Sequence, residues 1–164
     1  MGTRRGHGGV GRLLVGGPLT LALLATLHAG AALKAQTPLS GAAADSASLS
    51  VVRAYFTAYN AHDVEAVLRL VAPDFVWLSL AGDSVVVEAR GAEAIRTGLV
   101  DYLRRLPSAR SDIEAISALG PWVSVRERAR WEGANGPRSQ AGLSVYEIRD
   151  GLLRRVWYYP VVRE

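Results

Sequence analysis

The stretch V-Y-E-I-R-D-G-L-L-R-R-V-W-Y-Y (residues 145–159) decides the fold, because it predicts two strands joined by a tight turn. Asp150-Gly151 is one of the strongest short hairpin signals, since a type I′ turn needs positive φ at both central positions. The runs on either side, 142–149 and 152–159, contain the β-branched and aromatic residues typical of strands. The C-terminal part of the chain is therefore expected to form antiparallel sheet.

A second stretch, V-S-V-R-E-R-A-R-W (residues 123–131), alternates strictly between two kinds of side chain. Its odd members are apolar apart from Glu127 at the centre, and its even members include Arg126, Arg128 and Arg130. A period of two is typical of a strand with one face in the core and the other in water. The pattern therefore predicts a carboxyl group on the apolar face, while the arginines form a solvated face or an oligomer contact.

The segments before these strands predict helices and a first hairpin. Apolar residues recur at helical spacing in three segments, and two short apolar runs joined by a turn lie between the second and the third. The expected elements are helices at 49–60, 64–72 and 92–106 and strands at 75–80, 85–90 and 113–119. Helices followed by an antiparallel meander form an α+β pattern.

The first 35 residues differ from the rest of the chain. Arg4, Arg5 and Arg12 precede an apolar run at 13–33, and small residues follow it. A basic start, an apolar middle and a small-residue end predict a signal peptide at 1–35, and hence an exported protein, periplasmic or secreted. The alternative is an uncleaved membrane anchor, because the run is long enough to span a bilayer of about 30 Å.

The remaining chain is predicted to be a flexible linker at 36–47, rich in small and polar residues, and one domain at 48–164. Four of the 19 basic residues lie in the leader, which leaves 15 basic against 15 acidic residues. A neutral domain gives no support for nucleic-acid binding, and no membrane partner is expected after leader removal. The chain has no cysteine, and the domain has one histidine, His62 in a turn. No metal and no cofactor are therefore expected.

Three stretches resemble the nuclear transport factor 2-like superfamily, in its SnoaL-like and ketosteroid-isomerase-like branch. They are Y-F-T-A-Y-N-A-H-D-V-E-A-V-L-R-L-V-A-P-D-F-V-W (residues 55–77), G-A-E-A-I (91–95) and the hairpin at 145–159. The resemblance implies a cone-shaped, curved, mixed but mainly antiparallel sheet wrapped around three helices, with a pocket on its concave side. It also implies a possible homodimer through the open side of the sheet. Such folds host isomerases, cyclases, dehydratases, epoxide hydrolases and non-catalytic binders, so the fold alone does not fix a function.

The resemblance also allows a test for ketosteroid isomerase chemistry. Tyr55 falls where the catalytic tyrosine of that branch sits. The carboxylate that moves the proton would fall at Ser79, and the second oxyanion donor would fall at Ser144. A serine hydroxyl does not act as a general base near neutral pH without a partner that activates it. Ketosteroid isomerase activity is therefore not expected.

Carried over to this chain, the resemblance predicts a pocket lined by aromatic, hydroxyl and apolar side chains around one carboxyl group. The candidate ligand-pocket residues are Tyr55, Tyr59, Trp77, Ser79, Val125, Glu127, Trp131, Ser144 and Tyr146. Glu127 and Tyr55 are the candidate catalytic residues, because burial in a cleft perturbs a carboxyl group in the way that acid–base catalysis requires. The alternative for Glu127 is a structural or ligand-orienting role, satisfied by a hydroxyl or an arginine.

Three functions remain open at this point. The first is an exported pocket domain that binds a small, largely apolar molecule. The second is an isomerase, lyase or hydrolase that needs no cofactor and uses Glu127 as general acid or base. The third is a protein-interaction scaffold whose cavity is filled by its own side chains.

Overall fold

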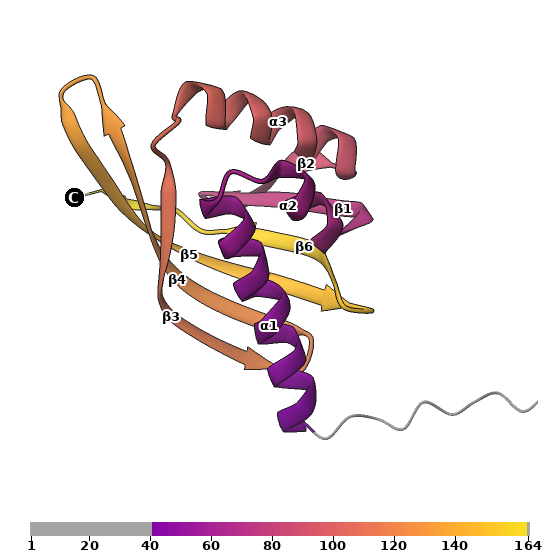
Figure 1. Cartoon of the computed structure of the whole chain (residues 1–164). Helices are drawn as coiled ribbons and strands as arrows, with labels where there is room; N and C mark the ends of the chain where they lie inside the picture. Colours follow the sequence, from indigo (N-terminus) through magenta and orange to yellow (C-terminus); the bar gives the residue numbers. More distant parts are fainter. Residues whose placement is uncertain (1–40, 164) are drawn as a thin grey trace, which may run out of the picture. The chain divides into compact units, whose positions relative to one another are not determined.

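The structure, a computed structural model, describes residues 41–163, and the predicted signal peptide lies outside them. The described residues form three helices and one mixed sheet (Figure 1). The elements are α1 (Gly41–Asn60), α2 (Val64–Leu70), β1 (Val71–Ala81), β2 (Ser84–Arg90), α3 (Ala92–Arg105), β3 (Arg110–Leu119), β4 (Trp122–Gly133), β5 (Gly136–Arg149), β6 (Leu152–Tyr158) and β7 (Val162–Arg163). The predicted α+β class is confirmed.

The sheet has the strand order β2-β1-β6-β5-β4-β3, and β7 pairs with β5. All neighbours are antiparallel except β1 and β6, which are parallel. Helix α1 packs against β3, β4 and β5, whereas α3 packs against β1 and β2 (Figure 1). The helices therefore cover one face of a curved sheet and leave the other face open, as the resemblance implied.

The hairpin that decides the fold has the predicted turn. Asp150 has φ 52° and Gly151 has φ 75°, which are the left-handed values that a type I′ turn requires. The turn sets the register of β5 against β6, in which Tyr146 lies opposite Val156 on the helix side of the sheet. Both side chains are buried in the main core with Phe56, Phe75 and other apolar residues.

Helix α1 begins earlier than the sequence predicted. It starts at Gly41, so residues 41–47 of the predicted flexible linker are helical. This segment is rich in alanine, the strongest helix former. Its side chains are also anchored to the β3–β4 turn, because Asp45 Oδ1 accepts a hydrogen bond from Gly120 N at 2.5 Å and Ser48 Oγ donates to Gly120 O at 2.7 Å. Contacts distant in sequence therefore stabilise the first turns.

His62 has a structural role in the turn after α1. His62 has φ 56°, and its Nε2 lies 2.8 Å from Ala109 O. The next residue, Asp63, caps α2 by accepting a hydrogen bond from Ala66 N at 2.8 Å.

In residues 41–163 no helix is both long and apolar enough to cross a membrane.

Candidate functional site

A cavity of about 540 Å³ lies between the helices and the curved sheet. Its walls are mainly apolar, and α1, α3, β1 and β6 contribute the aromatic side chains Tyr55, Phe56, Tyr59, Trp77, Tyr102 and Tyr158. These six are half of the chain's 12 aromatic residues, which comprise four Trp, six Tyr and two Phe. An open interior of this size is incompatible with the alternative of a scaffold whose cavity is filled by side chains.

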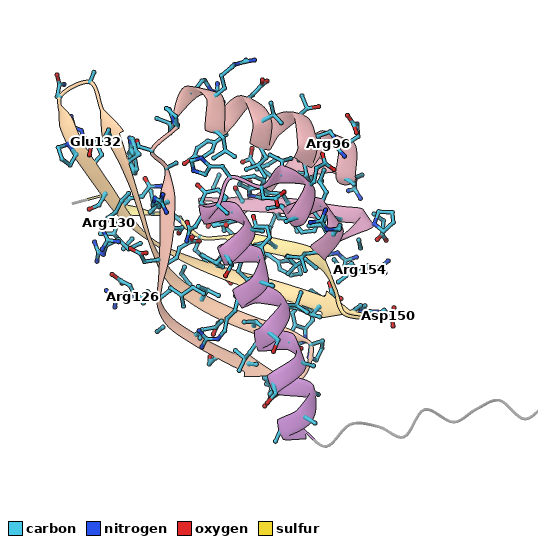
Figure 2. The ribbon with its side chains drawn as sticks, viewed as in Figure 1. Arg96, Arg126, Arg130, Glu132, Asp150 and Arg154 are labelled. Atoms are coloured by element: carbon cyan, nitrogen blue, oxygen red, sulfur yellow. The ribbon has the colours of Figure 1, made fainter. Side chains whose placement is uncertain are left out.

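Glu127 lines this cavity from the middle of β4 and is only 7% exposed. The strand alternation is the cause, because Val125 and Ala129 point the same way, while Arg126 and Arg130 point away from the helices (Figure 2). The outward arginines pair with acidic residues of β3, Glu114 and Asp112. The predicted inward orientation of Glu127 is therefore found.

Two serine hydroxyl groups hold the Glu127 carboxyl group. Ser111 Oγ of β3 donates to Oε2, and Ser144 Oγ of β5 donates to Oε1 at 3.3 Å. Burial raises the pKa of Glu127 above its usual range, and hydrogen bonds from neighbouring hydroxyl groups offset this shift only in part. No Lys, Arg or His side chain among residues 41–163 pairs with Glu127. Of the two partners that the sequence suggested, the hydroxyl is found and the arginine is not.

Ser111 is itself fixed by the end of α1. Asn60 Nδ2 donates to Ser111 O at 2.8 Å, and Ser111 N donates to Asn60 Oδ1 at 2.8 Å. This pair of hydrogen bonds locks the backbone of β3 beside the last turn of the helix. Asn60 therefore acts on Glu127 through Ser111, as a positioning residue.

Tyr55 lies on α1 beside Glu127. Burial and the Glu127 carboxylate both raise the pKa of Tyr55, so its hydroxyl keeps its proton at neutral pH. Its ring packs on Tyr146 with a centroid separation of 5.9 Å. The hydroxyl makes no side-chain hydrogen bond within residues 41–163, and it lines the cavity. It is therefore free to donate to a ligand next to Glu127.

Trp77 forms part of the opposite wall. Its ring packs against that of Tyr158, with centroids 5.5 Å apart. Its Nε1 is buried and has no hydrogen-bond partner among the described residues. Such an unpaired donor is uncommon in a folded protein, because its desolvation is not compensated. Trp77 thus contributes its ring to the wall of the cavity, and its Nε1 stays buried and unsatisfied among residues 41–163.

The mouth of the cavity carries charges of both signs. Glu88 of β2 and Arg105 at the end of α3 both line it, and both side chains are exposed. Gln140 of β5 and Val161 of the C-terminal segment lie at the same cavity. The polar groups are thus divided between an exposed mouth and the buried carboxyl group of Glu127.

Five of the nine predicted pocket residues line the cavity: Tyr55, Tyr59, Trp77, Ser79 and Glu127. The other four predicted residues are not among those that line it. Val125, Ser144 and Tyr146 do face the helix side, but they are at most 1% exposed. Trp131 lies beyond Ala129 towards the β4–β5 hairpin, at a separate surface hollow with Arg130 and Arg138.

Sequence reasoning missed the residues that α3, the β3 edge and the last strand contribute. Ala94, Gly98, Leu99 and Tyr102 reach the cavity only through the packing of α3, which no local pattern specifies. Ser111 and Tyr158 could have been found, because they lie opposite Ala129 and Ser144 in the strand register. That step would have required the pairing of all strands, which the sequence left undetermined.

The SnoaL-like domain family matches residues 52–156. This chain belongs to that family. The match includes all residues that line the cavity except Tyr158 and Val161. No curated protein sequence matches the chain.

Solved structures share the fold at low identity. An uncharacterized cystatin fold protein from Novosphingobium aromaticivorans is 23% identical with a TM-score of 0.59, over 68% of this chain and 96% of that chain. IdmH from Streptomyces antibioticus, a candidate polyketide cyclase, is 20% identical with a TM-score of 0.59, over 71% and 91%. An LEH-like epoxide hydrolase from M. tuberculosis is 20% identical with a TM-score of 0.57, over 70% and 83%. At this identity the likeness concerns the fold.

Proposed function

We propose that the protein is an exported pocket domain that binds a small, largely apolar molecule and orients its polar end at Glu127. The cavity of about 540 Å³ is the observation that carries this proposal. It falls within the range of roughly 300–1,000 Å³ in which small-molecule sites lie, and it combines apolar walls with few polar groups, as such sites do. Tyr55 adds a protonated hydroxyl group at the same cavity.

Gly98 offers a direct test of the pocket. It lies in α3 and lines the cavity, and a Cβ built there meets nothing within 4 Å. We expect Gly98→Leu to narrow the cavity and weaken binding of the neutral apolar dye Nile red, measured by its fluorescence. The fold should persist, because leucine is a stronger helix former than glycine by about 0.8 kcal/mol.

Gly98→Ala is the matched control. It supplies the same helix preference with a side chain too small to occupy the cavity, so it should bind the dye like the natural protein. Mass spectrometry of small molecules that co-purify with both variants would identify the ligand. Unchanged dye binding by Gly98→Leu would contradict the pocket proposal.

A second candidate function is proton-transfer catalysis without a cofactor, and the specific support is the pair Glu127 and Tyr55. Glu127 has a raised pKa, as a general acid or base needs, and the Tyr55 hydroxyl is a donor that no residue of the domain occupies. Once a substrate is identified, Glu127→Gln should lower its turnover by at least about a hundredfold. Full turnover in that variant would leave only the binding function.

Export rests on the N-terminal sequence alone. The basic start, apolar run and small-residue end support a leader that is removed. N-terminal sequencing of the protein from its native cells should find a start between residues 32 and 36. An intact Met1 in the membrane fraction would instead support the anchor.

A homodimer through the open side of the sheet stays a prediction. The face turned away from the helices carries the exposed apolar side chains Val85, Val87, Trp122 and Leu143. Trp122 also packs on Trp157, with ring centroids 5.7 Å apart. Exposed apolar groups on one face support a contact between copies there.

A further inference from the structure

The buried carboxyl group of the cavity has no counter-charge among residues 41–163. Two glutamates are buried among residues 41–163, Glu127 and Glu147. Glu147 receives hydrogen bonds from two arginines, whereas Glu127 receives them from hydroxyl groups only. A buried carboxylate without a cation is costly, so such groups are normally paired. The cavity side of Glu127 is where a cation could lie.

The walls of the cavity suit a particular kind of cation. Six aromatic side chains surround the space into which Glu127 points, and four of them are tyrosines. Aromatic faces attract cations, and aromatic cages recognise quaternary ammonium groups in particular. A bulky organic cation also offers the apolar surface that these walls would cover, which a hydrated metal ion does not. Among residues 41–163 no cluster of His, Asp and Glu has the arrangement of a metal site.

The charges at the mouth do not oppose such a ligand. Arg105 is the one cationic side chain among the lining residues, and it is exposed at the end of α3. Glu88, also exposed, lies at the same mouth with the opposite charge. Solvent screens both of these groups more than it screens the buried Glu127. Among the described lining residues, the interior of the cavity thus carries one acidic group, Glu127, and no basic group.

We propose that the cavity binds an organic ammonium ion, a tertiary or quaternary amine, whose positive charge lies against Glu127 between the aromatic side chains. This inference rests on the proposed small-molecule pocket and names the class of its ligand. The ammonium group supplies the counter-charge that the protein leaves out, and the remaining apolar part of the ligand fills the cavity.

The test compares two probes of equal shape and different charge. Choline carries a trimethylammonium group, and 3,3-dimethylbutan-1-ol carries a neutral tert-butyl group in its place. Their affinities for the full-length protein are measured by displacement of Nile red and by calorimetry near about pH 8. We expect choline to bind at least about tenfold more tightly, because a desolvated cation–π and carboxylate site discriminates by that much. Equal or tighter binding of the alcohol would overturn the proposal.

Two variants test which carboxylate, that of Glu127 or that of Glu88, produces the preference for choline. Glu127→Gln keeps the shape of the side chain and removes its charge, so the preference for choline should disappear. Glu88→Gln removes the exposed carboxylate at the mouth, so most of the preference should remain. A preference that depends on Glu88 instead of Glu127 would overturn the assignment of the site.

The pH dependence of the natural protein gives a test without a mutation. Protonation of Glu127 on acidification should weaken choline binding and leave the alcohol unaffected. The other titratable groups that face the cavity are Glu88, Arg105 and four tyrosines: Tyr55, Tyr59, Tyr102 and Tyr158. A choline affinity that does not change between about pH 8 and about pH 4 would contradict the proposal.

Failure of the ammonium proposal can be distinguished from failure of the small-molecule pocket proposal. If Nile red binds and is displaced by the alcohol but not by choline, or by neither probe, the ammonium proposal fails and the small-molecule pocket stands. If Nile red does not bind in the cavity, as judged by the Gly98→Leu variant, the pocket proposal fails as well.

Discussion

Each face of the sheet carries a buried glutamate, and the two glutamates have hydrogen-bond partners of different kinds. On the open face, Glu147 of β5 is 0% exposed, and its oxygens accept hydrogen bonds from Arg149 Nε at 2.6 Å and Arg155 Nη1 at 2.9 Å. On the helix face, Glu127 of β4 is 7% exposed and is held by Ser111 and Ser144. Among residues 41–163, Glu147 thus has two cationic partners, whereas Glu127 has hydroxyl partners and no cationic one.

The difference separates a buried charge that the fold itself compensates from one that, in our proposal, a ligand compensates. A carboxylate with two guanidinium partners stabilises the folded state, because its desolvation is compensated. A carboxyl group with hydroxyl partners only is desolvated without full compensation, and this is the origin of its raised pKa. Perturbed groups of that kind in a cavity are typical of functional sites. Exchange of either glutamate for glutamine should therefore have effects of opposite sign.

The largest change in the free energy of unfolding is expected when Glu147 is exchanged for glutamine. Glu147→Gln removes the charge between Arg149 and Arg155 and leaves a buried amide with poor partners. We expect the free energy of unfolding to fall by about 1–3 kcal/mol near neutral pH. This loss is smaller than that expected for a fully buried ion pair, because both arginines are partly exposed to solvent. Urea denaturation measures it.

Glu114→Gln is the matched control for Glu147. Glu114 also pairs with two arginines, Arg126 and Arg128, but its side chain is 26% exposed, against 1% for that of Glu147. Its loss should therefore be clearly smaller, because solvent screens exposed ion pairs. Equal losses in the two variants would show that burial of Glu147 is not the cause.

Glu127→Gln is expected to raise the free energy of unfolding, by less than Glu147→Gln lowers it. Because the folded-state pKa is raised, the protein is relatively most stable when Glu127 is protonated, and this contribution is lost as the pH rises through that pKa. Glu127→Gln should therefore unfold at a higher urea concentration than the natural protein near neutral pH. The two should converge as the pH falls below the usual range of a glutamate. A destabilised variant at neutral pH would contradict this assignment.

The sequence predicted the parts of this comparison that depend on local patterns. The alternation around Glu127 predicted the side of the sheet on which it lies, and Asp150-Gly151 predicted the turn that sets β5 against β6. The resemblance predicted the pocket and five of its residues.

The rest depends on contacts between distant segments. The start of α1 at Gly41 follows from anchoring to Gly120, which lies 75 residues from Asp45 in the sequence. That Glu127 meets the hydroxyl groups of Ser111 and Ser144 follows from the register of three strands, not from any single strand. The same register placed Glu147 between two arginines, which the sequence analysis did not foresee.

The most direct measurement is an NMR titration of the Glu127 side-chain carboxyl carbon, with Glu127→Gln used to assign the signal. We predict a pKa above the usual range of a glutamate in the ligand-free protein, and a decrease of that pKa when an ammonium probe binds. A pKa at or below the usual range in the ligand-free protein would show that the charge of Glu127 is already compensated, and it would contradict the incomplete site on which the proposals depend.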